Sequence, residues 1–307
     1  MSNRLRIASV YENRLGRNDG NPLYMWWAIS KYDPKRVESG HLVPYGDLTA
    51  YGKWDLHFEA DWGEDALKGI LPYEPVDIPH PNAFFSSDTH LGYEWRLAKA
   101  RKTDFNFVAQ KRAEEDFRRD GIPNPIWMPH AVEPMAYPYI PSIKKRDICF
   151  VGHLNSQNRI DALDRMFKEF PNFFFGQRLF EEAAEVYCQS KIVFNISISD
   201  DINMRVFEAL STRSFLLTNS VPTLELLFKD GVHLATYKTL DEAVEKAKYY
   251  LANDSEREAI AKAGQEEVLA KHTFRHRVET VLKHTGLYSR LLEAEKKDVP
   301  VVAQGVV

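Results

Sequence analysis

One arginine and one glutamate on the same predicted helix offer the clearest chemistry in this sequence. The stretch DDINMRVFEAL (residues 200–210) follows a strand-like run, and Asp201 or Asn203 can cap a helix that begins there. Arg205 and Glu208 are three residues apart, so they share one face of that helix. The arginine can hold a diphosphate at the helix start, and the glutamate can accept hydrogen bonds from ribose hydroxyls. The same spacing also fits an ordinary ion pair between neighbours.

A glycine-led loop comes earlier in the chain, in GHLNSQNR (residues 152–159), between a predicted strand and a predicted helix. Gly152 at the strand end allows backbone N–H groups to approach a phosphate, and the start of the helix favours negative charge. Arg159 lies one to two helical turns further on and can reach the same anion. A simple turn followed by a surface arginine explains these residues equally well.

Two further segments carry polar residues at predicted strand ends. In SSDTHLG (residues 86–92), Asp88 and His90 would face a site at the carboxyl end of the sheet. The alternative is a helix cap formed by Asp88 or Thr89, with the histidine in solvent. The loop of residues 12–21 contains Gly16, Asp19 and Gly20, which suit close approach to a phosphate or an acceptor. Its alternative is an ordinary mobile loop.

No pattern in the sequence predicts a metal site. His272 and His276 are one helical turn apart and could form half a site, but no HExxH motif or third ligand accompanies them. The acidic pair Asp200-Asp201 precedes a predicted helix, which indicates capping rather than metal binding. We therefore expect neither a metal nor another cofactor. The turn after the strand at residues 173–175, which begins at Gly176, could contact a nucleobase through its backbone.

The elements that must position these residues alternate between strands and helices, which is typical of parallel α/β lobes. Strands are expected at residues 6–11, 83–87, 105–110, 126–129, 147–151, 173–175, 192–197, 215–218 and 233–237. Helices are expected from Pro22, at residues 93–101, 111–120, 159–170, 183–189 and 204–212, after Pro222, and through most of the remainder.

Proline marks the expected boundary between two lobes. The segment EPMAYPYIPSIKKR (residues 133–146) has prolines at 134, 138 and 141 and can be neither a helix nor an inner strand. We expect a Rossmann-like lobe over residues 1–133, a linker over 134–146, a second Rossmann-like lobe over 147–285, and a terminal helix and tail over 286–307. Two doubly wound sheets place ligands at their carboxyl ends, in a cleft between the lobes.

Composition excludes several classes of protein. The 307 residues are 44% hydrophobic and 27% charged, as in globular proteins, and suffice for two domains. Lys and Arg (40) nearly balance Asp and Glu (44), so no basic surplus indicates nucleic-acid binding. Two cysteines build no disulfide framework, and no apolar run reaches the ~20 residues of a transmembrane helix. We expect a cytoplasmic protein.

Longer motifs resemble a known family. NMRVFEAL, SFLLTNSVPTLELLFKDG, YYLANDSERE and AKAGQEEVLAKHTFRHRV resemble the C-terminal half of group 1 glycosyltransferases, in particular the CgeB-like (spore maturation protein) variety. The upstream stretch EWRLAKARKTDFNFVAQKRAEEDFRRDGIPNPIWMPHAVEP is similar to the same proteins. The resemblance covers roughly residues 85 to 285. It implies the GT-B fold, with two Rossmann-like lobes, a nucleotide-sugar donor on the C-terminal lobe, and a metal-independent reaction that usually retains anomeric configuration.

The resemblance also implies roles for individual residues. The family's basic pair for the donor diphosphate matches His153 and Arg159, so histidine replaces the first basic residue, and Arg205 can supply the missing charge. Of the family's two glutamates, Glu208 matches the second and Asp200 falls at the first. The donor-binding residues expected are Gly152, His153, Asn155, Arg159, Gly176, Asn203, Met204, Arg205, Val206 and Glu208. Those expected to act in catalysis are Asp88, His90 and Arg205.

The expected reaction is transfer of a sugar from an NDP-sugar, most simply a UDP-sugar, to a hydroxyl acceptor. The acceptor is a saccharide, a protein, a small molecule or modified DNA. Three alternatives stay open. The first is a glycosyltransferase for modified DNA bases, against which the charge balance argues mildly. The second is a non-catalytic coat or assembly protein with this fold, and the third is a nucleotide-sugar epimerase.

Overall fold

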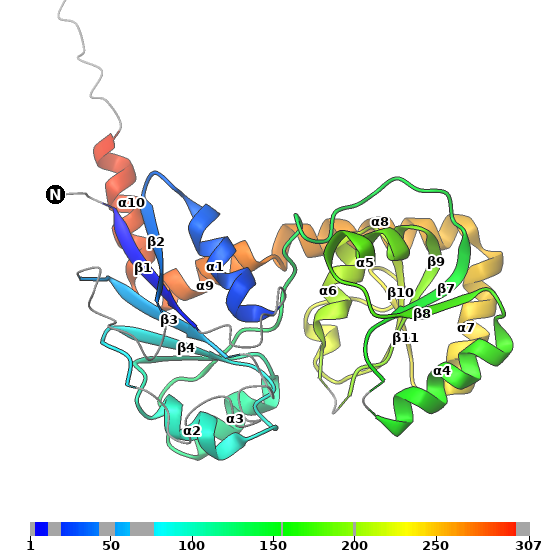
Figure 1. Cartoon of the computed structure of the whole chain (residues 1–307), viewed down its shortest axis with the longest axis horizontal. Helices are drawn as coiled ribbons and strands as arrows, with labels where there is room; N and C mark the ends of the chain where they lie inside the picture. Colours follow the sequence, from blue (N-terminus) through cyan, green and yellow to red (C-terminus); the bar gives the residue numbers. More distant parts are fainter. Residues whose placement is uncertain are drawn as a thin grey trace, which may run out of the picture. The chain divides into compact units, whose positions relative to one another are not determined.

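The computed structural model describes residues 4–11, 20–42, 53–61, 77–154, 156–198 and 201–298. The chain forms two compact units (Figure 1). Unit 1 comprises the chain up to Pro129 together with the chain from Arg275 onward, and unit 2 comprises His130–Phe274. Each unit is built on one parallel sheet, which is the doubly wound arrangement expected from the alternation of strands and helices.

The sheet of unit 1 has the strand order β2-β1-β3-β4-β5-β6, and all of its pairs are parallel. Its strands are β1 (Leu5–Val10), β2 (Val37–Leu42), β3 (Leu56–Ala60), β4 (Asn82–Ser86), β5 (Phe105–Val108) and β6 (Ile126–Trp127). Every residue of β4 is buried, as expected for an inner parallel strand that is covered on both faces.

Five helices accompany this sheet within the described part of the chain. They are α1 (Asn21–Tyr32), α2 (Tyr93–Ala100), α3 (Lys111–Arg119), α9 (Phe274–His284), whose first residue belongs to unit 2, and α10 (Leu287–Asp298). Pro22 lies in the first turn of α1, where its missing N–H group costs nothing. Gly20 caps that helix with φ 108°, a conformation that glycine adopts without strain.

The sheet of unit 2 has the order β11-β10-β9-β7-β8 and is also parallel throughout. Its strands are β7 (Arg146–Val151), β8 (Phe173–Gly176), β9 (Ser190–Asn195), β10 (Phe215–Asn219) and β11 (Ala235–Tyr237). Its helices are α4 (Gln157–Glu169), α5 (Phe180–Cys188), α6 (Met204–Ser211), α7 (Leu240–Ala252) and α8 (Asp254–Lys271). Helices α4 and α7 cover one face of this sheet, and α5, α6 and α8 cover the other (Figure 1).

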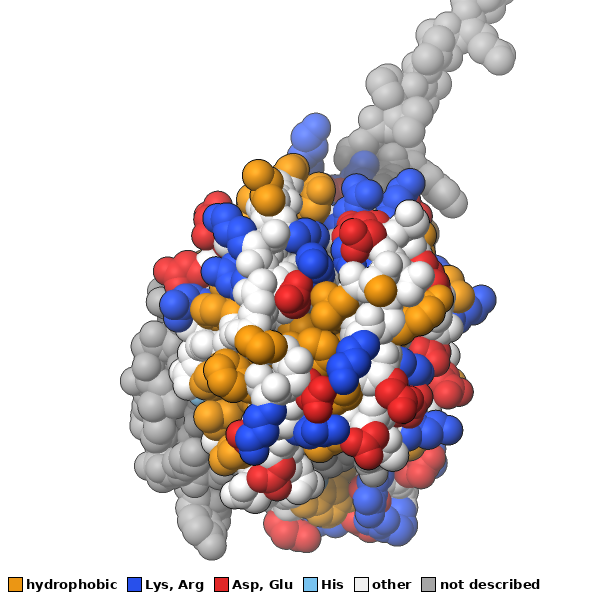
Figure 2. Space-filling view, turned by 90° about the vertical axis from the view of Figure 1, so that its right-hand side faces the viewer, with side chains coloured by type: hydrophobic (Ala, Val, Ile, Leu, Met, Phe, Trp, Pro, Cys, Tyr) orange, Lys and Arg blue, Asp and Glu red, His pale blue; other side chains and the backbone are white. Residues whose placement is uncertain are grey.

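Strand residues two apart face the same layer of helices in unit 2. Ile148 and Phe150 of β7, with Ile192 and Phe194 of β9, pack against Met166 and other apolar residues of α4 and α7. Burial of one such phenylalanine contributes about 2 kcal/mol. Figure 2 shows acidic, basic and apolar side chains intermixed on the face that is turned to the viewer.

The predicted fold class is confirmed, but three elements differ from the expectation. Strands β2 and β3 were not predicted, because VESGHL and LHFEA contain polar residues that break the apolar pattern. In β3, Glu59 is tolerated because it forms an ion pair with Lys99 at 2.5 Å. The prediction of a helix after Pro222 was wrong. Only a single 3₁₀ turn, Leu224–Leu226, forms there before the chain turns at Gly231 with φ 71°.

The compact units also have different limits from the expected domains. The expected second lobe ran to residue 285, whereas unit 2 ends at Phe274. The chain from α9 onward bonds to unit 1. The Arg275 Nη1 atom donates to the Tyr32 carbonyl at 2.5 Å, and the Arg277 Nε atom donates to the Pro129 carbonyl at 2.7 Å.

Candidate functional site

Gly152 directly follows strand β7 and has a backbone conformation that side chains rarely adopt. Its φ is 155°, and its N–H group donates to the Gly176 carbonyl at 3.0 Å. A Cβ atom at residue 152 would collide with the guanidinium of Arg205. The glycine predicted to approach a phosphate is therefore also the residue that makes room for an arginine from another element.

Arg159 lies buried at the start of α4. Its Nη1 atom donates to the His153 carbonyl at 2.9 Å, and its Nη2 atom donates to the Ile196 carbonyl at 3.1 Å. Ser156 caps the helix by accepting from the Arg159 N–H group at 3.4 Å. Arg159 thus ties the loop after β7 to the segment after β9. Burial, with a smaller effect of Arg205, lowers the pKa of the Arg159 guanidinium to about 10, so the group stays cationic at neutral pH.

Arg205 approaches the same place from the first turn of α6. Its Nη1 atom donates to the Asn195 Oδ1 atom at 2.7 Å. Its Cζ atom lies 4.3 Å from the centroid of the Phe150 ring, and the Cζ atom of Arg159 lies 5.6 Å from that centroid. Both guanidinium groups therefore pack on one aromatic ring, which favours cations over its face.

The positive charge of Arg205 has no carboxylate partner within the described ranges. The ion pair with Glu208 that its spacing allowed does not form, since Arg205 turns to Asn195 and Phe150 instead. Glu208 is half-buried, and its charge adds to the effect of burial in raising the pKa of the Tyr187 hydroxyl. Two arginines with neutral groups around Arg205 form a site that favours an anion.

Asn195 organises this site and was not predicted from the sequence. It lies fully buried at the carboxyl end of β9, and its Oδ1 atom accepts from both Arg205 and the Asn203 Nδ2 atom, the latter at 3.1 Å. Its Nδ2 atom donates to the Thr218 Oγ1 atom at 2.9 Å. An asparagine that ends the apolar run KIVFN was the available signal. No sequence signal marked Phe150, the residue whose ring lies under both arginines, because it looks like any other apolar residue of a core strand.

Asn203 is the N-cap of α6, but its side chain makes no capping hydrogen bond. The first N–H groups of that helix, at Met204 and Arg205, lack partners within the helix, as at every helix start. The dipole of α6 places positive potential at this end of the helix, from which Arg205 also comes. The carboxyl ends of β7 and β9 and the start of α6 thus converge on one anion site in unit 2.

The other residues predicted to bind the donor differ in exposure and in the groups that they contact. His153 is exposed and contributes its carbonyl to Arg159. Val206 is 1% exposed, so its side chain belongs to the core and only its backbone is available to a ligand. Gly176 accepts the hydrogen bond from Gly152 at the end of β8. Asn155 and Asp200 lie outside the described residues.

The predicted segment in unit 1 is held by a buried ion pair. Asp61 accepts from the Ser87 N–H group at 3.0 Å and from its hydroxyl at 2.7 Å, and it pairs with the Arg96 Nε atom at 2.8 Å. The Arg96 Nη1 atom donates to the Leu91 carbonyl at 2.6 Å. Neither Asp61 nor Arg96 was predicted to take part in this segment.

Asp88 and His90 lie between these anchored points. Asp88 has φ 49°, and His90 is exposed. The alternative, a helix cap by Asp88 or Thr89, does not occur, since Gly92 is the N-cap of α2. The catalytic roles of Asp88 and His90 stay predictions. Gly20 begins α1, whereas Gly16 and Asp19 lie outside the described residues.

The described ranges contain no cluster of three or more His, Cys, Asp or Glu side chains that could hold a metal ion. His272 lies between the rings of Phe207 and Phe228, with centroids 6.0 Å and 4.9 Å away. None of the helices in these ranges is both long and apolar enough to cross a membrane.

Residues 152–283 match a protein-family model described as glycosyl transferase-like. The matched part begins at Gly152 and contains both arginines of the anion site. No curated protein matches the chain.

Solved structures with the GT-B fold resemble most of the chain. Sucrose-phosphate synthase from Thermosynechococcus elongatus has a TM-score of 0.61 at 12% identity, over 95% of this chain and 100% of that one. An alpha-glucosyltransferase in complex with UDP and a 13-mer DNA containing a HMU base has a TM-score of 0.61 at 8% identity, over 94% and 100%. TarM, from S. aureus, has a TM-score of 0.54 at 11% identity and is longer, so that the alignment covers 75% of this chain and 54% of TarM. The chain therefore has the GT-B fold.

Proposed function

We propose that this chain, with its GT-B fold and glycosyl transferase-like second unit, transfers a sugar from an NDP-sugar to a hydroxyl acceptor. The donor proposed is a UDP-sugar, since relatives by fold have been solved with UDP, among them Anabaena HepE in complex with UDP and glucose. The reaction proposed retains the anomeric configuration and requires no metal ion. The CgeB-like variety remains the proposed subfamily.

The observation that carries the proposal is the pair of arginines on the Phe150 ring. In the reaction, the bond between the anomeric carbon and the diphosphate oxygen breaks, and a bond from that carbon to the acceptor oxygen forms. Negative charge develops on the diphosphate as it leaves. Arg159, Arg205 and the N–H groups at the start of α6 would stabilise this charge at fixed positions, which is the usual source of large rate enhancements.

The two arginines also explain how the reaction can proceed without a metal. In a metal-dependent transferase, a divalent cation neutralises the diphosphate. Here two guanidinium charges would supply that neutralisation, and Asn195 holds Arg205 without cancelling its charge. Glu208, one helical turn further along α6, is the proposed partner of the ribose hydroxyls.

The direct test is calorimetric titration of UDP into the full chain and into Arg205→Ala. The variant should bind UDP about ten- to a hundredfold more weakly, because a hydrogen bond to a charged group contributes about 1.5–3 kcal/mol. Arg165→Ala is the matched control, since Arg165 is an exposed arginine on α4 that pairs with Glu169. Equal affinity in Arg205→Ala and wild type would remove Arg205 from the site.

Turnover is measured separately with a panel of UDP-sugars in the presence of EDTA. Release of UDP with EDTA present supports a metal-independent transferase, and NMR of the product reports the anomeric configuration. Binding of UDP without turnover of any UDP-sugar would favour the non-catalytic alternative. Binding of another nucleoside diphosphate in preference to UDP, observed by thermal shift, would change the donor.

A further inference from the structure

A pocket in unit 2 lies at the opposite end of the strands from the anion site. Its volume is about 260 Å³, and it is lined by Tyr139, Ser142, Lys144, Cys188, Arg213 and Glu258. Lys144, Cys188 and Arg213 lie two residues before β7, β9 and β10, so the pocket is at the amino ends of these strands. Gly152 and Asn195, by contrast, lie at the carboxyl ends. The pocket is therefore separate from the proposed donor site.

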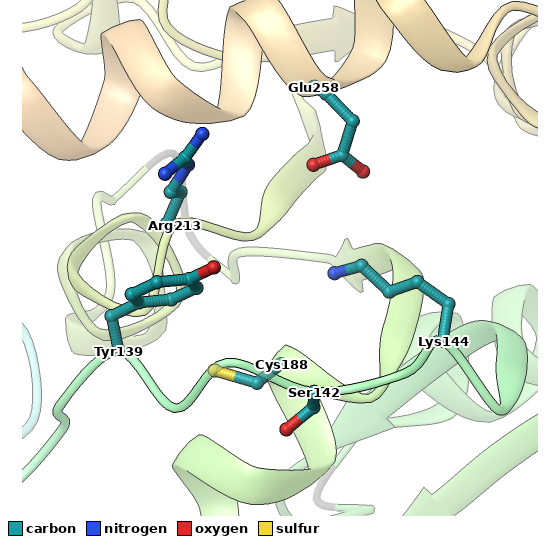
Figure 3. Close-up of a pocket in the computed structure, with 6 residues that line it drawn as sticks. All are labelled: Tyr139, Ser142, Lys144, Cys188, Arg213 and Glu258. Carbon is teal, nitrogen blue, oxygen red and sulfur yellow. The ribbon is translucent and has the colours of Figure 1, made fainter.

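Four charged or polar groups line one space in this pocket (Figure 3). The Lys144 ammonium and the Tyr139 hydroxyl point toward each other, and the Arg213 guanidinium and the Glu258 carboxylate lie above them as drawn. The Ser142 hydroxyl points away from these groups and donates to the Ile140 carbonyl at 2.9 Å. They come from the segment before β7, the turn before β10, and helix α8.

Neither of the two cations has a close ion-pair partner within the described part of the chain. Neither the Lys144 ammonium nor the Arg213 guanidinium forms a hydrogen bond or an ion pair there, and the Arg213 Cζ atom lies 5.5 Å from the centroid of the Tyr139 ring. The Glu258 carboxylate pairs with the Arg257 Nη2 atom at 3.4 Å and acts on Lys144 from a longer distance. Burial lowers the pKa of Lys144 and the charge of Glu258 opposes this effect, so the ammonium lies in a poorly hydrated place with only a distant counterion.

Arg213 occupies a backbone position that disfavours it. Its φ is 54°, in the left-handed region that follows many helix ends and that suits glycine best. The residue follows α6 and its C-cap Thr212. Strained backbone conformations often occur at functional sites, so the conformation of Arg213 favours a functional role for its charged side chain. Stacking on Tyr139 fixes the guanidinium at the mouth of the pocket.

We propose that this pocket binds a small phosphorylated polyol. Its phosphate would lie between Lys144 and Arg213, because a guanidinium and an ammonium together match the charge of an oxyanion. Its hydroxyl groups would donate to the Glu258 carboxylate. A carboxylate beside the two cations repels an anion that has no hydrogen-bond donor. The same carboxylate accepts hydrogen bonds from an anion that carries hydroxyl groups, so the site favours such a ligand. The volume suits about nine non-hydrogen atoms, at ~30 Å³ for each water-sized group.

The test is calorimetric titration of glycerol 3-phosphate into the full chain, with UDP present in excess to occupy the proposed donor site. Saturable binding at one site is expected. Lys144→Met and Arg213→Gly should each weaken it at least tenfold. The glycine variant suits φ 54° and so keeps the fold, which a thermal melt verifies. Lys145→Ala, at an exposed neighbouring lysine, is the control and should bind as wild type does.

Two further titrations define the ligand class. Inorganic phosphate should bind more weakly than glycerol 3-phosphate, and Glu258→Gln should abolish this difference. Glycerol alone should not bind. Absence of binding to the wild type, or equal binding by wild type, Lys144→Met and Arg213→Gly, would overturn the proposal. Equal affinity for phosphate and glycerol 3-phosphate would overturn the part assigned to Glu258.

Discussion

The guanidinium of Arg205 occupies the space in which a side chain of residue 152 would begin. Residue 152 directly follows β7, and residue 205 is the second residue of α6, more than fifty positions later. The absence of a side chain at Gly152 allows Arg205 to pack on Phe150 at 4.3 Å and to bond to Asn195. Glycine and arginine at these positions therefore act together, although no sequence motif contains both.

Replacement of Gly152 by alanine should abolish tight binding of UDP. The new Cβ atom displaces the Arg205 guanidinium, and φ 155° disfavours any side chain. A loss of about tenfold or more in UDP affinity is expected in calorimetry, equivalent to about 1.4 kcal/mol. Gly231→Ala is the matched control, since its φ is 71° and no atom lies within 4 Å of the added Cβ. It should cost some stability and leave affinity unchanged. If Gly152→Ala and Gly231→Ala bind UDP equally well, the space that Gly152 leaves for Arg205 does not affect donor binding.

Replacement of Asn195 by aspartate should weaken UDP binding without unfolding unit 2. The carboxylate would stand 2.7 Å from the Arg205 Nη1 atom and would neutralise the charge proposed to hold the diphosphate. Affinity should fall about tenfold, and the melting temperature should stay near that of the wild type because the new charge is paired. Asn172→Asp, at an exposed asparagine before β8, is the control. UDP affinity that is unchanged in Asn195→Asp would contradict this role.

Loss of Arg96 should destabilise unit 1 strongly. Its side chain and that of Asp61 are 0% and 1% exposed, so Arg96→Met leaves a buried carboxylate without its cation. The free energy of unfolding, measured in urea, should fall by about 3–5 kcal/mol. Arg118→Met breaks the ion pair with Glu114 on the surface, where the Arg118 side chain is 57% exposed, and should cost less than about 1 kcal/mol. Similar losses of unfolding free energy in Arg96→Met and Arg118→Met would show that the buried ion pair stabilises the fold no more than the exposed pair does.

Binding of glycerol 3-phosphate should weaken as the pH is raised. Burial lowers the pKa of Lys144, and an anion binds its protonated form, so affinity is full below that pKa and declines as the pH rises through it. The decline should begin below the ordinary lysine value of about 10.4. The other titratable or charged groups that face Lys144 are Glu258, Arg257, Arg213, Tyr139, Cys149 and Cys188. Burial raises the pKa of both thiols, that of Cys149 to about 12, so they stay neutral in this range.

The matched variant for that prediction is Lys144→Arg. It keeps the positive charge and moves its titration to a much higher pH, so calorimetry should show an affinity that no longer depends on pH in the range where the wild type declines. If the wild type and Lys144→Arg share one pH profile, Lys144 does not hold the anion.

The sequence predicted those parts of the fold that depend on local pattern. Apolar runs such as DICFV and KIVFN predicted inner strands, and Pro22 predicted the start of a helix. It failed at β3, where Glu59 breaks the pattern and Lys99, forty residues away, compensates for it. It failed again after Pro222, where helix-forming residues make only one 3₁₀ turn. At β3, a contact between distant residues outweighs local preference.

The sequence by itself determined the two parallel α/β units, the glycine at the end of β7, and the arginines of the anion site. These follow from residue type and spacing, which act over a few positions. Only the tertiary structure decided that Arg205 turns away from Glu208 toward Asn195, and that Phe150 lies under both arginines. It alone placed Lys144 and Arg213 around one pocket. The reason is physical. The packing of parallel strands brings their ends together regardless of their separation along the chain. Which groups bind a charged side chain therefore depends on the residues that meet at these strand ends, not on the spacing in the sequence.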